Sequence, residues 1–208
     1  MKIARFLSLT LVVTAMFCSC SQDEGPRRIA PLDDGLKADA LTDCTVAADF
    51  RTEDFDWEEG TLNMTVLRED LYDAVEVSQL KVGDTLIYES KPMVVTTIAD
   101  EHGTLSINGG LEEGGCWLEG YEGGTYRSVQ FDDHSTYTKL GKAKLPLSQD
   151  LVIIDCGENP DDSNDTILAA QRNYIEALDG YRQSFTDLNT RVVIMNGLVK
   201  EIHRKWIP

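Results

Sequence analysis

The chain has 208 residues, of which 42% are hydrophobic and 26% are charged, and its formal net charge at pH 7 is −17. This hydrophobic content is ordinary for a globular protein, and the length suits one domain with a sizeable core. The excess of negative charge repels phosphate backbones, and no basic stripe with interleaved aromatic residues offsets it. We therefore expect no nucleic acid among the partners, whereas a cationic partner is compatible with the charge.

The first 19 residues have the order of a secretory signal peptide. A basic start with Lys2 and Arg5 precedes an apolar run over 6–17, and small residues follow. This run is shorter than the roughly 20 apolar residues that a membrane-spanning helix needs. We therefore expect residues 1–19 to be a signal peptide that directs export.

The end of this leader, Phe17-Cys18-Ser19-Cys20, resembles the lipobox of bacterial lipoproteins. In that motif a small residue precedes a cysteine that is acylated and becomes the new N-terminus. Ser19 is small, whereas the bulky Phe17 precedes Cys18, so the resemblance implies lipidation at Cys20 with acyl chains such as palmitate. It also implies an anchor in the cell membrane or outer membrane, with the globular part outside the cytoplasm. A cleaved signal peptide without lipid is the alternative.

Residues 20–43 are rich in charged residues, proline and glycine and show no apolar periodicity. Such a segment buries too little surface to order itself, so we expect a flexible acidic tether before a single domain over 44–208. Cys44, Cys116 and Cys156 lie in this domain. In an oxidising space two of them can form a disulfide and one thiol is left over, and the sequence does not decide which two pair.

Short β-rich runs separated by turn residues dominate this domain. In one of them Leu62, Met64 and Val66 alternate with polar residues, as in a half-buried strand. The same reasoning predicts strands over 44–50, 61–67, 74–80, 85–88, 93–98, 104–107 and 151–154, and a hairpin of 125–131 with 136–140. Short turns between neighbours favour an antiparallel meander. We interpret the glycine-rich stretch 108–124 as tight turns or bulges rather than as a binding loop.

The pattern changes late in the chain. Ile167, Ala170, Tyr174 and Leu178 recur at three- and four-residue steps, which predicts an amphipathic helix. An Asn-Gly pair at 196–197 between two strand-like runs predicts a closing hairpin. The expected fold class is α+β, mostly antiparallel β as a meander, rolled sheet or small barrel, with one late amphipathic helix.

Trp117, Tyr121 and Tyr126 lie beside glycines and glutamates, a combination that could stack on sugar rings while carboxylates bind hydroxyl groups. Aromatic residues also sit at the edges of hydrophobic cores, and that interpretation is the commoner one. A carbohydrate ligand at these three residues is therefore one hypothesis, beside a cationic or a protein partner.

Catalysis would need either a thiol or a carboxylate pair. Cys116 could act as a nucleophile if a base lay near it, and His102, His134 and His203 are the histidines that could supply one. A carboxylate pair cannot be singled out from 36 acidic residues without their separation in space.

A calcium site is conceivable at Asp161, Ser163 and Asp165, which alternate as oxygen ligands of Ca²⁺ do. Arg172 stands where an EF-hand has its bidentate Glu, which excludes that motif, and helix capping explains these residues more simply. No motif for a cofactor is present, and we expect none. The sequence favours a non-enzymatic, lipid-anchored envelope protein with a binding or structural role. The alternatives are an exported hydrolase or transferase and a calcium-dependent binding protein.

Overall fold

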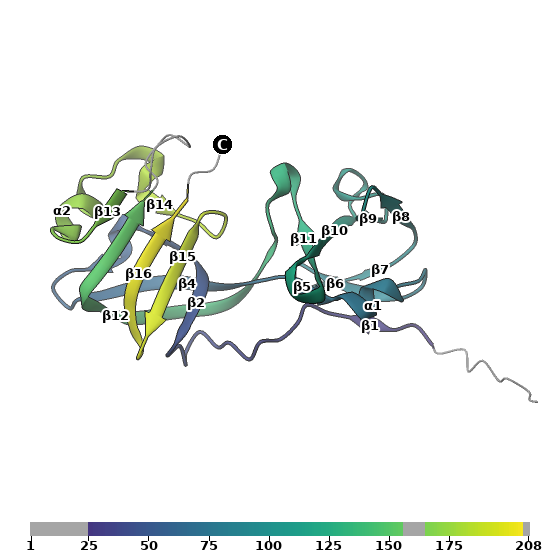
Figure 1. The fold of residues 1–208 in the computed structure, drawn as a ribbon, viewed down its shortest axis with the longest axis horizontal. Coiled ribbons are helices and arrows are strands. Elements are labelled where there is room, and N and C mark those ends of the chain that lie inside the picture. Colours follow the sequence, from purple (N-terminus) through teal and green to yellow (C-terminus); the bar gives the residue numbers. More distant parts are fainter. Residues whose placement is uncertain (1–24, 156–164, 206–208) are drawn as a thin grey trace, which may run out of the picture.

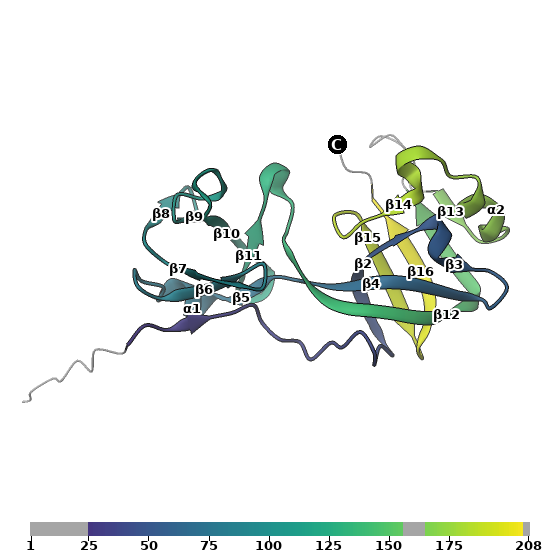
Figure 2. The same ribbon diagram turned by 180° about the vertical axis from the view of Figure 1, so that it is seen from behind.

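The computed structural model describes residues 25–155 and 165–205. Figure 1 shows two lobes side by side along the long axis, and each lobe has its own cluster of buried hydrophobic residues. The strands β4 (Thr61–Glu69) and β12 (Tyr137–Asp155) run from one lobe towards the other, as Figure 2 shows from behind. Residues 25–155 and 165–205 are strand-rich and contain two short α-helices, so the mostly antiparallel β class is confirmed.

The first lobe, called the barrel lobe, is built around a closed ring of five strands. The ring consists of β12, β16 (Leu198–Arg204), β15 (Thr190–Met195), β2 (Cys44–Arg51) and β4. It closes because β12 is long enough to have two partners: its first half pairs antiparallel with β4, and its last part pairs parallel with β16. A register shift between Leu147 and Val152 marks the bend between the two halves. Short strands extend the sheet, namely β3 (Phe55–Asp56), β13 (Asp165–Ile167) and β14 (Ser184–Phe185).

Alternating residues of these strands fill the barrel. Leu62, Met64 and Val66 of β4 are buried, as their alternation predicts. The helix α2 (Gln171–Glu176) adds Ile175 to the same core. Next to it, the buried Arg204 forms an ion pair with the buried Asp155, and the Tyr174 hydroxyl donates a hydrogen bond to Asp155 at 2.8 Å. This pair connects β12, β16 and α2 at one end of the barrel.

The second lobe, called the small lobe, contains a five-stranded and a three-stranded sheet. The first has the order β5 (Leu71–Asp73), β11 (Thr125–Val129), β10 (Cys116–Tyr121), β9 (Thr104–Ile107) and β8 (Ile98–Glu101). The second has the order β1 (Arg28–Ile29), β6 (Thr85–Tyr88) and β7 (Lys91–Val94). The side chain of Tyr72 lies fully buried between them and donates to the Ile87 carbonyl at 2.8 Å.

The strand predicted over 74–80 is wrong, because this segment forms the helix α1 (Ala74–Ser78). The side chain of Asp73 accepts hydrogen bonds from the N–H groups of Val75 and Glu76 and thereby caps the helix. Over so few residues, the alternation of Val75 and Val77 with polar neighbours does not distinguish a strand from a helix, so the predicted strand was wrong. The strand predicted over 93–98 is likewise divided between β7 and β8.

The predicted late helix is present, but it is shorter than the spacing from Ile167 to Leu178 indicates. Ile167 lies in β13, where it pairs with Ile153 of β12, and α2 begins only at Gln171. Pairing with the barrel edge therefore overrides the helical spacing. The residue before α2, Ala170, has φ of 56° and makes no side-chain cap. Of the residues expected to cap the helix, Asp165 lies in β13, and Asp161 and Ser163 are outside the described residues.

Two predicted hairpins have different outcomes. The closing hairpin is confirmed: β15 and β16 pair antiparallel, and Asn196 and Gly197 both have the positive φ that such a two-residue turn requires. The hairpin of 125–131 with 136–140 holds only near its turn, where Val129 bridges Ser135. Beyond the turn β12 leaves β11 and pairs with β4 instead.

The part of the expected tether that the structure describes, residues 25–43, is not a free coil. Ile29 is buried in the small-lobe core and Leu41 in the barrel core. Asp84, which is fully buried, accepts hydrogen bonds from the N–H and the guanidinium of Arg27 at 2.8 and 3.0 Å. The segment thus lies along both lobes, because single apolar residues such as Ile29 and Leu41 are buried in the two cores even though the segment has no apolar periodicity.

Candidate functional site

The outer face of β10 and β11 gathers aromatic and charged side chains from both strands. Trp117, Glu119 and Tyr121 alternate with the buried Cys116 and Leu118, so they point away from the small-lobe core. In the antiparallel register Glu119 lies opposite Arg127, and both side chains are on this face. We call the surface formed by Trp117, Glu119, Tyr121, Arg127 and Phe131 the aromatic face.

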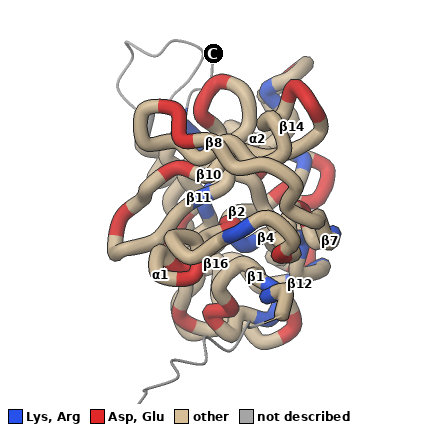
Figure 3. The backbone as a smooth tube through the Cα atoms, turned by 90° about the vertical axis from the view of Figure 1, so that its right-hand side faces the viewer, with Lys and Arg blue, Asp and Glu red and all other residues tan. Residues whose placement is uncertain are grey.

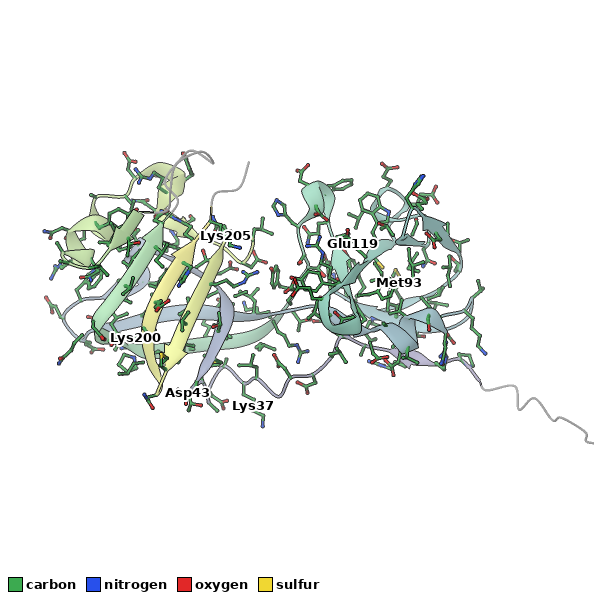
Figure 4. The ribbon with its side chains drawn as sticks, viewed as in Figure 1. Lys37, Asp43, Met93, Glu119, Lys200 and Lys205 are labelled. Atoms are coloured by element: carbon green, nitrogen blue, oxygen red, sulfur yellow. The ribbon has the colours of Figure 1, made fainter. Side chains whose placement is uncertain are left out.

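Arg127 is the centre of the aromatic face. Its guanidinium donates to Glu119 at 2.7 Å and to Asp133 at 2.8 Å, and it stacks over the ring of Tyr121 with 5.3 Å to the centroid. Burial alone would lower the pKa of Arg127, but Glu119 and Asp133 raise it above its ordinary value. The charge is therefore permanent, and it fixes the two carboxylates and one aromatic ring in place. Figure 4 shows Glu119 on the small lobe.

Two of the three aromatic residues singled out from the sequence share this face. Tyr121 is 41% exposed, and Trp117 is half-buried and meets the exposed Phe131 edge to face, with ring centroids 5.6 Å apart. Tyr126 lies opposite Gly120 and packs against the core on the other side of the sheet. The structure thus brings Trp117 and Tyr121 together and separates Tyr126 from them.

The backbone of the glycine-rich stretch packs closely against the ring of Trp117. Gly110 has φ of +71°, and a Cβ there would lie 2.1 Å from Nε1 of the Trp117 ring. A Cβ on Gly115 would lie 1.8 Å from the Ile107 carbonyl oxygen. These contacts agree with the interpretation of residues 108–124 as tight turns, and they show why glycine is needed at those two positions.

Cys116 is placed for packing. Its side chain is fully buried in the small-lobe core, and burial raises the pKa of the thiol to about 12. No histidine hydrogen-bonds to it within the described part of the chain. A thiol held neutral in this way is a poor nucleophile at physiological pH. Cys44 is also a free thiol and belongs to the other lobe, so these two cysteines do not form a disulfide.

The barrel lobe has two adjoining surface hollows, of about 520 and 330 Å³, which share Asp49. Asp49 Oδ1 accepts a hydrogen bond from the N–H of Asp187 at 2.6 Å. Burial raises the pKa of Asp49, and the Asp187 carboxylate adds to this effect. Lys142 and Lys144 line the larger hollow. Asp49 and Asp187 therefore lie side by side, but the contact joins the carboxylate of Asp49 to the backbone of Asp187.

A buried polar cluster lies where β4 passes into β5, at the junction of the lobes. The fully buried Asp70 accepts hydrogen bonds from the hydroxyls of Thr138, at 2.6 Å, and Thr136, at 3.2 Å. The hydroxyl of Ser128 contacts that of Thr136. No pattern in the sequence marks Asp70, Asp49 or Arg127 among so many charged residues, because their roles depend on pairing between distant strands.

The other expected sites lie mostly beyond the described residues. Cys20, Asp161, Ser163 and Cys156 are outside them, and Asp165 is the first residue of β13. Within residues 25–155 and 165–205 no three histidine, cysteine, aspartate or glutamate side chains are grouped as a metal site would need. In the same ranges no helix has the length and apolarity to cross a bilayer.

The chain was compared with protein-family models, with curated proteins and with solved structures, and none of them matches it.

Proposed function

We propose that this protein is an exported, lipid-anchored envelope protein without enzymatic activity, and that its aromatic face binds carbohydrate chains. The anchor rests on the signal peptide and the lipobox-like end at Cys20. The ligand class rests on the aromatic face, where Tyr121 and Phe131 are exposed beside carboxylates fixed by Arg127. Aromatic rings can cover the apolar faces of sugar rings while carboxylates accept from hydroxyl groups.

The spacing on β10 favours an extended ligand. Trp117 and Tyr121 are four residues apart on one strand, so their Cα atoms are separated by about 13 Å, with Glu119 between them. A linear oligosaccharide can contact both rings, whereas a single sugar ring cannot. Acidic residues are spread over the loops of both lobes, as Figure 3 shows, which favours neutral glycans over anionic ones.

The enzyme alternative receives less support. The thiol route would need an accessible Cys116, and that side chain is fully buried. The carboxylate route would need a free Asp49, and Asp49 is hydrogen-bonded to the backbone of Asp187.

The first prediction concerns Tyr121. Titration of the mature protein with neutral oligosaccharides, followed by NMR, should shift signals from the aromatic face. The Tyr121→Ala variant should bind about tenfold more weakly, which corresponds to the loss of one ring contact worth about 1.4 kcal/mol. Tyr181→Ala is the matched control, because Tyr181 is a 77% exposed tyrosine of the barrel lobe. Equal affinities of these two variants, or no binding of any neutral glycan, would contradict the carbohydrate proposal.

A further inference from the structure

We propose that the end of the small lobe formed by α1, β1 and the turn before β6 lies against the headgroups of the membrane that carries the lipid anchor. This inference rests on the proposed lipidation of Cys20. Figure 1 shows the described chain entering the molecule at this end, beside β1 and α1. The membrane-facing surface is defined by Arg28, Val75, Lys81 and Val82.

The first argument is the point at which the chain becomes fixed. Arg27 is held to the buried Asp84 by its own N–H and by its guanidinium, and the N–H of Lys81 also donates to Asp84, at 3.1 Å. The guanidinium of Arg27 also donates to the side chain of Gln79 at 2.9 Å. The chain is therefore held to the small lobe from position 27, well before position 44, where the sequence predicted the domain to begin.

The second argument is the length of chain that remains. Residues 21–26 alone separate Cys20 from Arg27. Fully extended, the seven Cα steps span at most about 25 Å. A lobe of about 80 residues is roughly 30 Å across, so this linker is shorter than the lobe that it carries. The small lobe therefore stays next to the bilayer instead of moving clear of it.

The third argument is the chemistry of the surface. Val75 and Val82 are each 63% exposed, although both are apolar. Arg28 in β1 and Lys81 in the turn before β6 are also exposed. Apolar side chains with basic neighbours suit the boundary between headgroups and acyl chains. Glu76 is exposed on α1 as well, so apolar contact contributes more than attraction to anionic lipids.

The test measures water accessibility at two positions of the full mature chain. A Cys44→Ala, Cys156→Ala background leaves the buried Cys116, and a spin label is attached through Val82→Cys or, as the matched control, Tyr181→Cys. The acylated proteins are reconstituted into phosphatidylethanolamine–phosphatidylglycerol vesicles. Collisions of each label with an aqueous nickel chelate are then compared with those in a chain without lipid that carries Cys20→Ser, so that no second thiol takes up the label.

On vesicles, the collision rate of the label at position 82 with the chelate should be several-fold lower than in the chain without lipid. The collision rate of the label at position 181 should be unchanged. Equal accessibility of both labels on vesicles would overturn the proposed contact with the membrane. A chain that carries no acyl groups and does not float with vesicles would instead overturn the proposed anchor, so the two failures are distinguishable.

Discussion

Asp70 and Asp84 are both fully buried aspartates, yet their surroundings shift their pKa values in opposite directions. Burial raises the pKa of Asp70, and the hydroxyls of Thr138 and Thr136 offset this only in part. Burial also acts to raise the pKa of Asp84, but the N–H groups of Arg27 and Lys81 and the Arg27 guanidinium lower it below the ordinary value. The difference is that Asp84 is in contact with the guanidinium of Arg27, whereas no cationic side chain of the described residues hydrogen-bonds to Asp70.

The second prediction follows from these opposite shifts. The folded state keeps Asp70 protonated to a higher pH than the unfolded chain does, so this group costs stability as the pH rises above about 4. Asp84 contributes stability above that pH and loses it as the pH falls through its lowered pKa. At pH 7, Asp70→Asn should therefore raise the free energy of unfolding, while Asp84→Asn should lower it by about 1–3 kcal/mol.

Urea denaturation at several pH values measures both effects. Both differences from the original protein should shrink as the pH falls: that of Asp70→Asn towards about pH 4 and below, where Asp70 is protonated in either state, and that of Asp84→Asn only at lower pH, because the pKa of Asp84 is lowered in the folded state. The same sign for the two variants at pH 7 would contradict the assignment of their environments.

Close backbone approach determines the geometry of the strand that carries the aromatic face. Gly115 enters β10 so near to β9 that a Cβ would lie 1.8 Å from the Ile107 carbonyl oxygen. Gly120 lies in the same strand, where a Cβ would meet no atom within 4 Å and φ is not left-handed. The two positions therefore make a matched pair.

The third prediction is that Gly115→Ala lowers the free energy of unfolding by about 2–4 kcal/mol, because the β9–β10 pairing must move. Gly120→Ala should be neutral or slightly stabilising, since glycine is unfavourable within a strand. Thermal unfolding followed by circular dichroism measures both variants. An equally small effect of the two substitutions would show that the β9–β10 pairing does not need glycine at position 115.

The elements that could be predicted from the sequence are those with a local cause. The alternation in β4 and the Asn-Gly turn before β16 identify a strand and a hairpin, because each pattern specifies its own backbone. The helix α1 depends on its Asp73 cap, and β13 depends on pairing with β12, so periodicity alone misassigned both. Of the candidate site, Trp117 and Tyr121 were identifiable as aromatic residues, but Arg127 depends on the β10–β11 register.

At the scale of the whole molecule, the two lobes are connected where the chain passes from a strand of one sheet to a strand of another. The chain passes from β4 through Asp70 directly into β5, and it returns from β11 into β12, where the hydroxyls of Ser128 and Thr136 are in contact. The N-terminal segment runs along both lobes and contributes Ile29 to one core and Leu41 to the other. The point of attachment at Arg27 therefore places the small lobe nearer to the proposed anchor than the barrel lobe.

The mass of the mature N-terminus is the measurement that tests the lipid anchor most directly. Mass spectrometry of the protein from native membranes should find a chain that starts at Cys20 and carries acyl chains. A chain from the cytosol that retains Met1, or an unmodified chain that starts at another residue, would contradict the lipid anchor and, with it, the membrane-facing orientation of the small lobe.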